Sequence, residues 1–143
     1  MVLEMCKLWK CEKKCEWCFL VFRVFIGLLF AVHGAMKFGI IGEGTISGFA
    51  TGVGIPLWLG VIVGLIELVG GLAIAFGILT RLFAAFAGIE LIVAYIMAHL
   101  PNGWNPFTNG GELALVYLAS FILLFGYGAG KFSLDSLLCK KCK

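Results

Sequence analysis

The sequence predicts an all-α fold, an integral membrane four-helix bundle with antiparallel transmembrane helices. The chain has 143 residues, of which 62% are hydrophobic and 13% charged, whereas soluble domains are about 45–50% apolar and about 25% charged. Its mean hydropathy is +1.06, and its apolar residues gather in four continuous stretches. Each stretch is near the roughly 20 residues that a membrane-crossing helix needs. The composition therefore disfavours both a soluble enzyme and a disordered chain.

The predicted bundle occupies residues 19–130 as one domain. In chain order the four predicted spans are residues 19–38, 55–79, 82–100 and 113–129. Their apolar runs are continuous rather than alternating, and they are about twice as long as a barrel strand, so helices are favoured over strands.

The connections between the spans differ in length. Thr80 and Arg81 alone separate the second and third spans, which predicts a tight antiparallel hairpin. Residues 39–54 are rich in Gly, Ser and Thr and are predicted to form the first loop, and residues 101–111 the third. Thr108 or Asn109 is predicted to cap the fourth helix, with Glu112 in its first turn.

Positive charge predicts the orientation of the bundle. With four spans, ten of the eleven Lys and Arg residues fall on one side of the membrane, and Lys37 alone falls on the other. We therefore expect a multi-pass protein of the cell membrane whose Cys- and Lys-rich tails, residues 1–18 and 131–143, are both cytoplasmic. The net charge of +3 comes mostly from these ends, so the expected partner is membrane lipid and no nucleic acid is expected.

Ionisable residues within the spans predict a polar pocket inside the bundle, because such residues are costly in lipid. Glu67 lies 13 residues before Thr80 and Glu90 lies 10 residues after it, which puts both about 15–20 Å from the predicted inner boundary. The others fall in the outer half. The predicted lining residues are His33, Lys37, Glu67, Glu90, His99 and Glu112.

Three interpretations of this pocket follow from its chemistry. Buried glutamates, protonated or paired with Lys37 or a histidine, can simply hold helices in register. Alternatively, His and protonated Glu supply the hydrogen-bond donors and the proton route that a quinone headgroup needs. His33 and His99 could instead ligate a haem, but two histidines alone are weak support, and haem is disfavoured.

Two further features concern packing. Arg23, near the cytoplasmic end of the first span, is predicted to extend toward the membrane surface or to pair with Asp135. Glycines in the second and fourth spans predict close helix contacts. These glycines are Gly70, Gly71, Gly77, Gly126, Gly128 and Gly130.

All six cysteines lie in the tails. Two Cys-x-x-Cys pairs, formed by Cys15 with Cys18 and by Cys139 with Cys142, supply four thiolates that suit zinc, iron or an iron–sulfur cluster. The predicted topology lets the two pairs meet. A dithiol redox centre, disulfides that join the termini, and lipidated thiols are the alternatives. The additional thiols are Cys6 and Cys11.

The order of several motifs resembles the DoxX family of four-helix membrane proteins, over about residues 20–137. The first span reads Arg23-x3-Gly27-x2-Phe30-x2-His33-Gly34-x2-Lys37. The second span and the hairpin read Glu67-x2-Gly70-Gly71-Leu72 and Gly77-x2-Thr80-Arg81. The last span reads Asn109-Gly110-Gly111-Glu112-x4-Tyr117, followed by Gly126, Gly130 and Ser133-Leu134-Asp135.

This resemblance implies a fold and a redox neighbourhood rather than a reaction, because the family is named for a subunit associated with a terminal quinol oxidase. The leading functional hypothesis is a redox-associated membrane subunit that binds quinone or a similar lipid in the polar pocket and works with a soluble redox partner. The alternative is a non-enzymatic carrier or accessory scaffold whose cysteine tails bind a structural metal. The cysteine tails depart from the usual family pattern. A homo-oligomer is compatible with either hypothesis.

Overall fold

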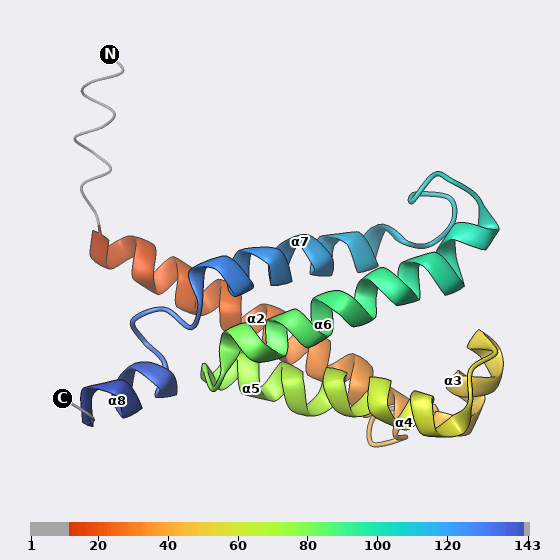
Figure 1. The fold of residues 1–143 in the computed structure, drawn as a ribbon, viewed down its shortest axis with the longest axis horizontal. Coiled ribbons are helices and arrows are strands. Elements are labelled where there is room, and N and C mark those ends of the chain that lie inside the picture. The colour runs from red at the N-terminus through yellow and green to blue at the C-terminus, as the bar shows by residue number, and fades with distance from the viewer. Residues whose placement is uncertain (1–11, 142–143) are drawn as a thin grey trace, which may run out of the picture.

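The computed structural model describes residues 12–141, with side chains described for residues 15–138. Every regular element in this part of the chain is a helix (Figure 1), which confirms the all-α fold class. Three helical segments within it are long and apolar enough to cross a membrane, and they span Cys15–Lys37, Leu57–Phe76 and Thr80–Asn102. A fourth apolar helix, α7 (Glu112–Tyr127), has 16 residues and is therefore about 24 Å long.

Two of the spans are continuous helices in which an α-helix is followed by a π-helical turn. The second span consists of α4 (Leu57–Leu65), the π-helical turn η1 (Ile66–Gly70) and α5 (Gly71–Phe76). The third consists of α6 (Thr80–Ala94), the π-helical turn η2 (Tyr95–His99) and the 3-10 turn η3 (Leu100–Asn102). Such π turns occur frequently at functional sites, and here each contains one predicted site residue.

The first span is α2 (Glu12–Lys37), which begins seven residues before the predicted start at Phe19 and so includes Cys15 and Cys18. A short helix, α8 (Leu134–Lys141), follows the last span. The start of α2 and the segment after α7 lie side by side: the backbone N–H of Lys131 donates to Glu16 Oε2 over 3.3 Å. The rings of Trp17 and Phe132 also lie 4.7 Å apart. The first and the last helix of the bundle therefore have their terminal segments in contact, on the same side of the bundle.

The predicted hairpin between the second and third spans is present, but its turn lies earlier than Thr80 and Arg81. Gly77, with φ of 72°, ends α5, and Leu79, with φ of 46°, precedes α6. Asp135 accepts hydrogen bonds from the backbone N–H groups of Leu79 over 3.0 Å and of Thr80 over 3.4 Å. The aspartate thus satisfies free donors at the start of α6.

The first connection contains a helix that the sequence analysis missed. Residues 39–54 were predicted as a loop, but Ile46–Val53 form α3, so this prediction was wrong in its second half. Thr45 Oγ1 accepts from the backbone N–H of Gly48 over 3.0 Å, and Gly54, with φ of 76°, ends the helix in the left-handed conformation. A Thr N-cap and a Gly C-cap on an apolar segment favour a helix even when the segment is short.

The predicted capping of the fourth helix was also wrong. The N-cap of α7 is Gly111, and no side chain caps this helix. Asn109 Oδ1 instead accepts from the backbone N–H of Gly111 over 2.8 Å, which is a turn immediately before the helix. Thr108 donates its hydroxyl to the carbonyl of Asn105 over 3.1 Å and so serves the loop.

Arg23 does not extend to the membrane surface, and among the described residues it forms no close ion pair with Asp135. Its side chain is 2% exposed and donates to the backbone carbonyls of Ala129 and Phe132, the latter over 2.9 Å. The predictions for this residue were wrong because the segment after α7 folds over the end of α2 and presents free carbonyl groups, which a guanidinium group can satisfy with several donors at once.

The helices pack as two pairs, α2 with the second span and α6 with α7. Glycines allow α2 and α5 to approach closely, as predicted for Gly71: a Cβ at Gly27 would lie 2.6 Å from the Gly71 carbonyl oxygen, and one at Gly71 would lie 2.5 Å from the Ala31 nitrogen. Gly126, in contrast, has no neighbour near its Cβ position. The two pairs converge near α8 and diverge toward the opposite end, where α3 lies (Figure 1).

Candidate functional site

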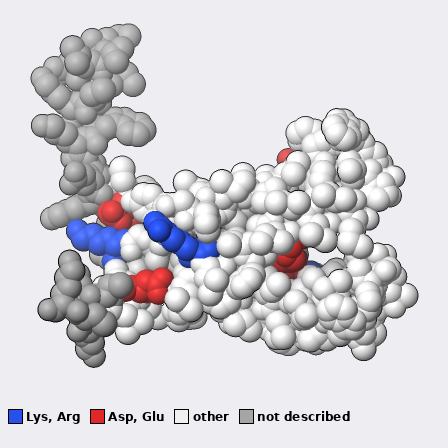
Figure 2. All heavy atoms as spheres, in the orientation of Figure 1, with Lys and Arg blue, Asp and Glu red and all other residues white. Residues whose placement is uncertain are grey.

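A cavity of about 470 Å³ lies between the two diverging helix pairs. In Figure 2 the surface at this end is hollowed, and acidic atoms are visible at the bottom of the hollow. The walls are mostly apolar and come from α2, α3, α4, η1, α6, η2 and α7. Because its polar groups are few and concentrated, the cavity has the character of a site for a hydrophobic small molecule with a polar part.

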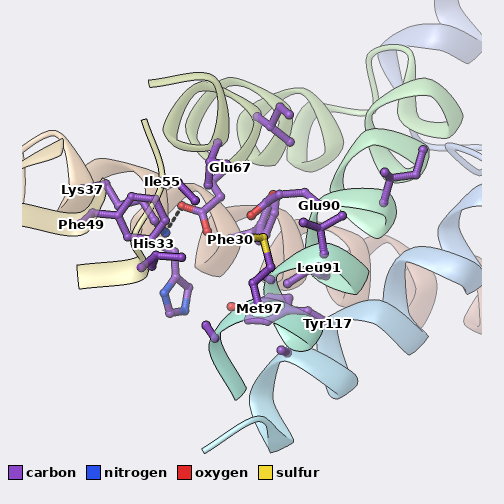
Figure 3. Close-up of a pocket in the computed structure, with 18 of the residues that line it drawn as sticks. Phe30, His33, Lys37, Phe49, Ile55, Glu67, Glu90, Leu91, Met97 and Tyr117 are labelled. Atoms are coloured by element: carbon purple, nitrogen blue, oxygen red, sulfur yellow. Dashed lines mark hydrogen bonds and ion pairs between the residues drawn. The ribbon is translucent and has the colours of Figure 1, made fainter. Parts of the chain in front are cut away.

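The centre of the polar cluster is an ion pair between Lys37 and Glu67 (Figure 3). Lys37 lies in the last turn of α2, where a cation is favourable to the helix dipole. Glu67 lies in the π turn η1 and is 6% exposed. The Lys37 ammonium group also lies 4.5 Å from the centre of the Phe49 ring on α3. The ion pair therefore joins the first two spans, and α3 covers it with an aromatic face.

Glu90, on α6, extends toward Glu67 from the opposite helix pair (Figure 3). Its Oε2 atom is buried and has no hydrogen-bond partner among the described residues. Buried polar atoms in folded proteins almost always have a partner, so an exception of this kind requires an explanation. The atom lies in a residue that lines the cavity, which identifies the cavity as the place where a partner could be supplied.

Two histidines complete the polar lining. His33, on α2 one turn before Lys37, has its ring edge-on to that of Tyr117, with ring centres 5.7 Å apart. His99, at the end of η2, has its Nδ1 atom 3.2 Å from the carbonyl oxygen of Asn109. This contact fixes one ring nitrogen of His99 to the loop before α7.

The structure thus brings together five of the six residues predicted to line the pocket: His33, Lys37, Glu67, Glu90 and His99. The exception is Glu112, which is exposed and does not line the cavity. It occupies the first turn of α7, where Leu113 and Tyr117, four residues apart on one helix face, turn toward the cavity instead.

Sequence reasoning missed four aromatic lining residues, Phe30, Phe49, Phe86 and Tyr117. Phe30 and Tyr117 belong to the motifs that resemble the family. Phe30 and Tyr117 are buried, and their rings pack together with centres 5.6 Å apart. Phe49 belongs to α3, which was expected to be a loop. Aromatic residues in apolar segments carry no signal that separates a cavity wall from a lipid-facing surface.

A second, more polar hollow adjoins the cavity on the side of α3. It shares His33, Lys37 and Phe49 with the cavity and adds Glu43 and Thr45 from the connection before α3. The polar cluster is therefore reached from two sides, one through this polar connection and one through the apolar walls.

The predicted metal site falls largely outside the described residues. Cys15 and Cys18 are exposed, three residues apart on α2, whereas the side chains of Cys6, Cys11, Cys139 and Cys142 are among those not described. Within residues 15–138, no group of three or more His, Cys, Asp or Glu side chains could hold a metal ion. Zinc or iron at the Cys-x-x-Cys pairs remains a prediction.

Comparison with known proteins adds a family and several relatives. The model of the DoxX family matches residues 18–100. A Haemophilus influenzae uncharacterized protein is 35% identical over 127 residues, covering 86% of this chain and 92% of that protein. The Bacillus subtilis protein named "Putative oxidoreductase CatD" is 34% identical over 121 residues, covering 85% and 87%. The Escherichia coli inner membrane protein YqjF is 36% identical over 124 residues, covering 85% and 92%. No solved structure matches this chain with significant similarity.

Proposed function

This chain belongs to the DoxX family of membrane proteins, and we propose that it is a redox-associated membrane subunit that binds a quinone, or a similar lipid, in the cavity between its helix pairs. The observation that carries this proposal is the unpartnered, buried Glu90 Oε2 atom at an apolar cavity whose other polar groups lie close by. A quinone combines an apolar ring and tail with carbonyl oxygens that accept hydrogen bonds, so it matches both parts of the lining.

The polar residues divide into ligand donors and proton holders. In this proposal His33 and Lys37 donate hydrogen bonds to the quinone carbonyl groups, which carry more negative charge as the quinone is reduced. Reduction of a quinone to a quinol also takes up as many protons as electrons. Glu67 and Glu90 are the groups that would hold or transfer these protons within the cavity, and the hollow beside Glu43 provides their connection to water.

The electrons have to come from outside the cavity lining, which contains no redox-active group. A soluble redox partner subunit supplies them in this proposal. The name of the Bacillus subtilis relative, which includes the word oxidoreductase, supports a redox setting. The excess of Lys and Arg on the side of the termini supports a multi-pass arrangement in the cell membrane with both termini in the cytoplasm.

A second candidate function is that of a non-enzymatic carrier or accessory scaffold whose cysteine tails bind zinc or iron. The contact of Glu16 with Lys131 and of Trp17 with Phe132 favours it, because this contact brings the start of α2 close to the segment that leads into the second cysteine pair. Metal analysis of the purified protein distinguishes the candidates: a visible absorption spectrum from iron supports electron transfer, and colourless zinc supports a scaffold.

The quinone site is tested by binding of tritiated decylubiquinone, and separately of a short-chain menaquinone, to the protein in nanodiscs, corrected for empty nanodiscs. We expect saturable binding to the wild-type protein with at least one of the two. His33→Ala and Glu90→Leu should each weaken it about tenfold, because each removes one hydrogen-bonding group from a buried site.

Glu112→Leu is the matched control for Glu90→Leu, because it makes the same change at an exposed glutamate that does not line the cavity. It should leave binding unchanged. The proposal is overturned if neither quinone binds saturably, or if all three variants bind as the wild type does.

A further inference from the structure

The cavity has an apolar opening between α4 and α6. The tight Gly77–Leu79 turn joins the two spans to which these helices belong. From this turn α6 packs against α5 and η1, and it then diverges from α4 (Figure 1). The hollow in Figure 2 lies between the separated ends. The opening therefore faces sideways, toward the region that the acyl chains of a bilayer would occupy around the spans.

The α6 side of the opening is a continuous apolar stripe. It consists of Phe86, Ile89 and Val93 on α6 and continues to Met97 in η2. Their spacing of three, four and four residues places them along one face of the third span. Each of them lines the cavity and is nevertheless exposed, Ile89 most of all at 61%. The stripe runs from Phe86 to Met97, or about 16 Å along the helix axis.

On the α4 side of the opening, too, an apolar residue both lines the cavity and is exposed. Ile62 lines the cavity and is 43% exposed, and the half-buried Leu59 and Ile66 lie one turn to either side of it on the cavity wall. The two rims therefore carry no polar side chain between the polar cluster and the outside. An apolar channel of this kind stabilises a hydrocarbon chain and disfavours a polar or charged solute.

The side of the polar cluster next to α3 differs in chemistry. There the second hollow includes Glu43 and Thr45 and meets the cluster at His33 and Lys37. The polar cluster thus adjoins both a polar hollow and an apolar opening. A ligand that matches both the polar cluster and the apolar opening has a polar headgroup at one end and a hydrocarbon tail at the other.

We propose that the bound ligand is a tailed amphiphile whose headgroup lies at Lys37, Glu67 and Glu90 and whose tail leaves the protein through the opening between α4 and α6 into the bilayer. This inference rests on the proposed quinone site and assigns it a substrate class, quinones that carry a tail rather than water-soluble quinones. The α6 stripe and Ile62 are then the residues that hold the tail.

The test compares two ligands with the same benzoquinone headgroup, decylubiquinone and its tailless parent, on protein in nanodiscs. Ile89→Trp places a bulky ring in the opening and should weaken binding of decylubiquinone about tenfold, while binding of the tailless quinone changes less than about twofold. Comparison of each variant with the wild type for the same ligand removes the effect of partition into the lipid. Ile89→Ala, which widens the opening, should retain both ligands.

Ile122→Trp is the control, since Ile122 on α7 is exposed to a similar extent, 64%, but does not line the cavity. It should change neither affinity, and the thermal midpoints of both Trp variants show whether each folds. Equal loss of the two ligands in Ile89→Trp, or no loss of the tailed one, overturns the tail path and leaves the headgroup site intact. Failure of the wild type to bind either ligand, or a short-chain menaquinone, overturns the proposed function itself.

Discussion

Individual residues in this protein show why charge in an apolar chain is informative. Lys37, Glu67 and Glu90 could be assigned to a shared interior site from sequence, because exposure of these groups to lipid costs far more than a paired, sheltered arrangement. The structure places all three at one cavity. The same reasoning failed for Glu112, since a residue in the first turn of a helix near the membrane boundary can face water without that cost.

The Lys37–Glu67 pair gives a prediction at this scale. Lys37→Met leaves a glutamate buried without its cation, and we expect a loss of about 3–5 kcal/mol in the free energy of unfolding. Lys37→Met combined with Glu67→Leu should recover most of this loss, because no unpaired charge remains. Unfolding of the detergent-solubilised protein, followed by helical circular dichroism, measures both. A double variant as unstable as the single one would show that the unpaired carboxyl group is not the cause.

At the scale of elements, the long apolar spans were predictable, whereas their local detail was not. Continuous hydrophobicity over 20 residues predicts a helix. A π turn such as η1 or η2 cannot be predicted in this way, because its residues do not differ in type from those of the α-helix around it. The short helix α3 could have been found, because Thr45 and Gly54 are an ordinary pair of cap residues. Its composition, rich in glycine, was instead interpreted as a loop.

The crossing of α2 and α5 gives a prediction at this scale. Gly27→Ala would place a methyl group 2.6 Å from the Gly71 carbonyl oxygen and the Ala75 nitrogen, and backbone atoms cannot move aside cheaply. We expect a loss of about 1–3 kcal/mol in unfolding free energy. Gly126→Ala on α7, where nothing lies near the added methyl group, should instead be neutral or stabilising by about 0.5–1 kcal/mol.

Denaturant unfolding of the two alanine variants alongside the wild type measures both effects. Equal stability of the two variants would contradict the close approach of α2 and α5. The comparison is direct because each substitution adds the same single carbon atom within a helix, so differences in helix propensity largely cancel.

The whole molecule has two unlike ends. Three basic residues, Arg23, Arg81 and Lys131, lie around the end of α7 and the segment after it, where the helix pairs converge. Figure 2 shows a cluster of charged atoms at this end of the molecule. The opposite end, where the pairs diverge, contains the cavity and Lys37. The concentration of basic residues at one end could be predicted from the distribution of Lys and Arg along the chain. The divergence of the two helix pairs could not, because it depends on helix angles, which a hydrophobicity pattern does not specify.

The central claim is that a quinone headgroup binds at Glu90 and the Lys37–Glu67 pair. An experimental density map of the protein, purified from membranes and reconstituted in nanodiscs with excess decylubiquinone, tests it most directly. We expect a planar density between the helix pairs, with one edge at Glu90 and His33 and an elongated extension between α4 and α6. A cavity closed by the protein's own side chains, or quinone density confined to the outer surface of the spans, would contradict it.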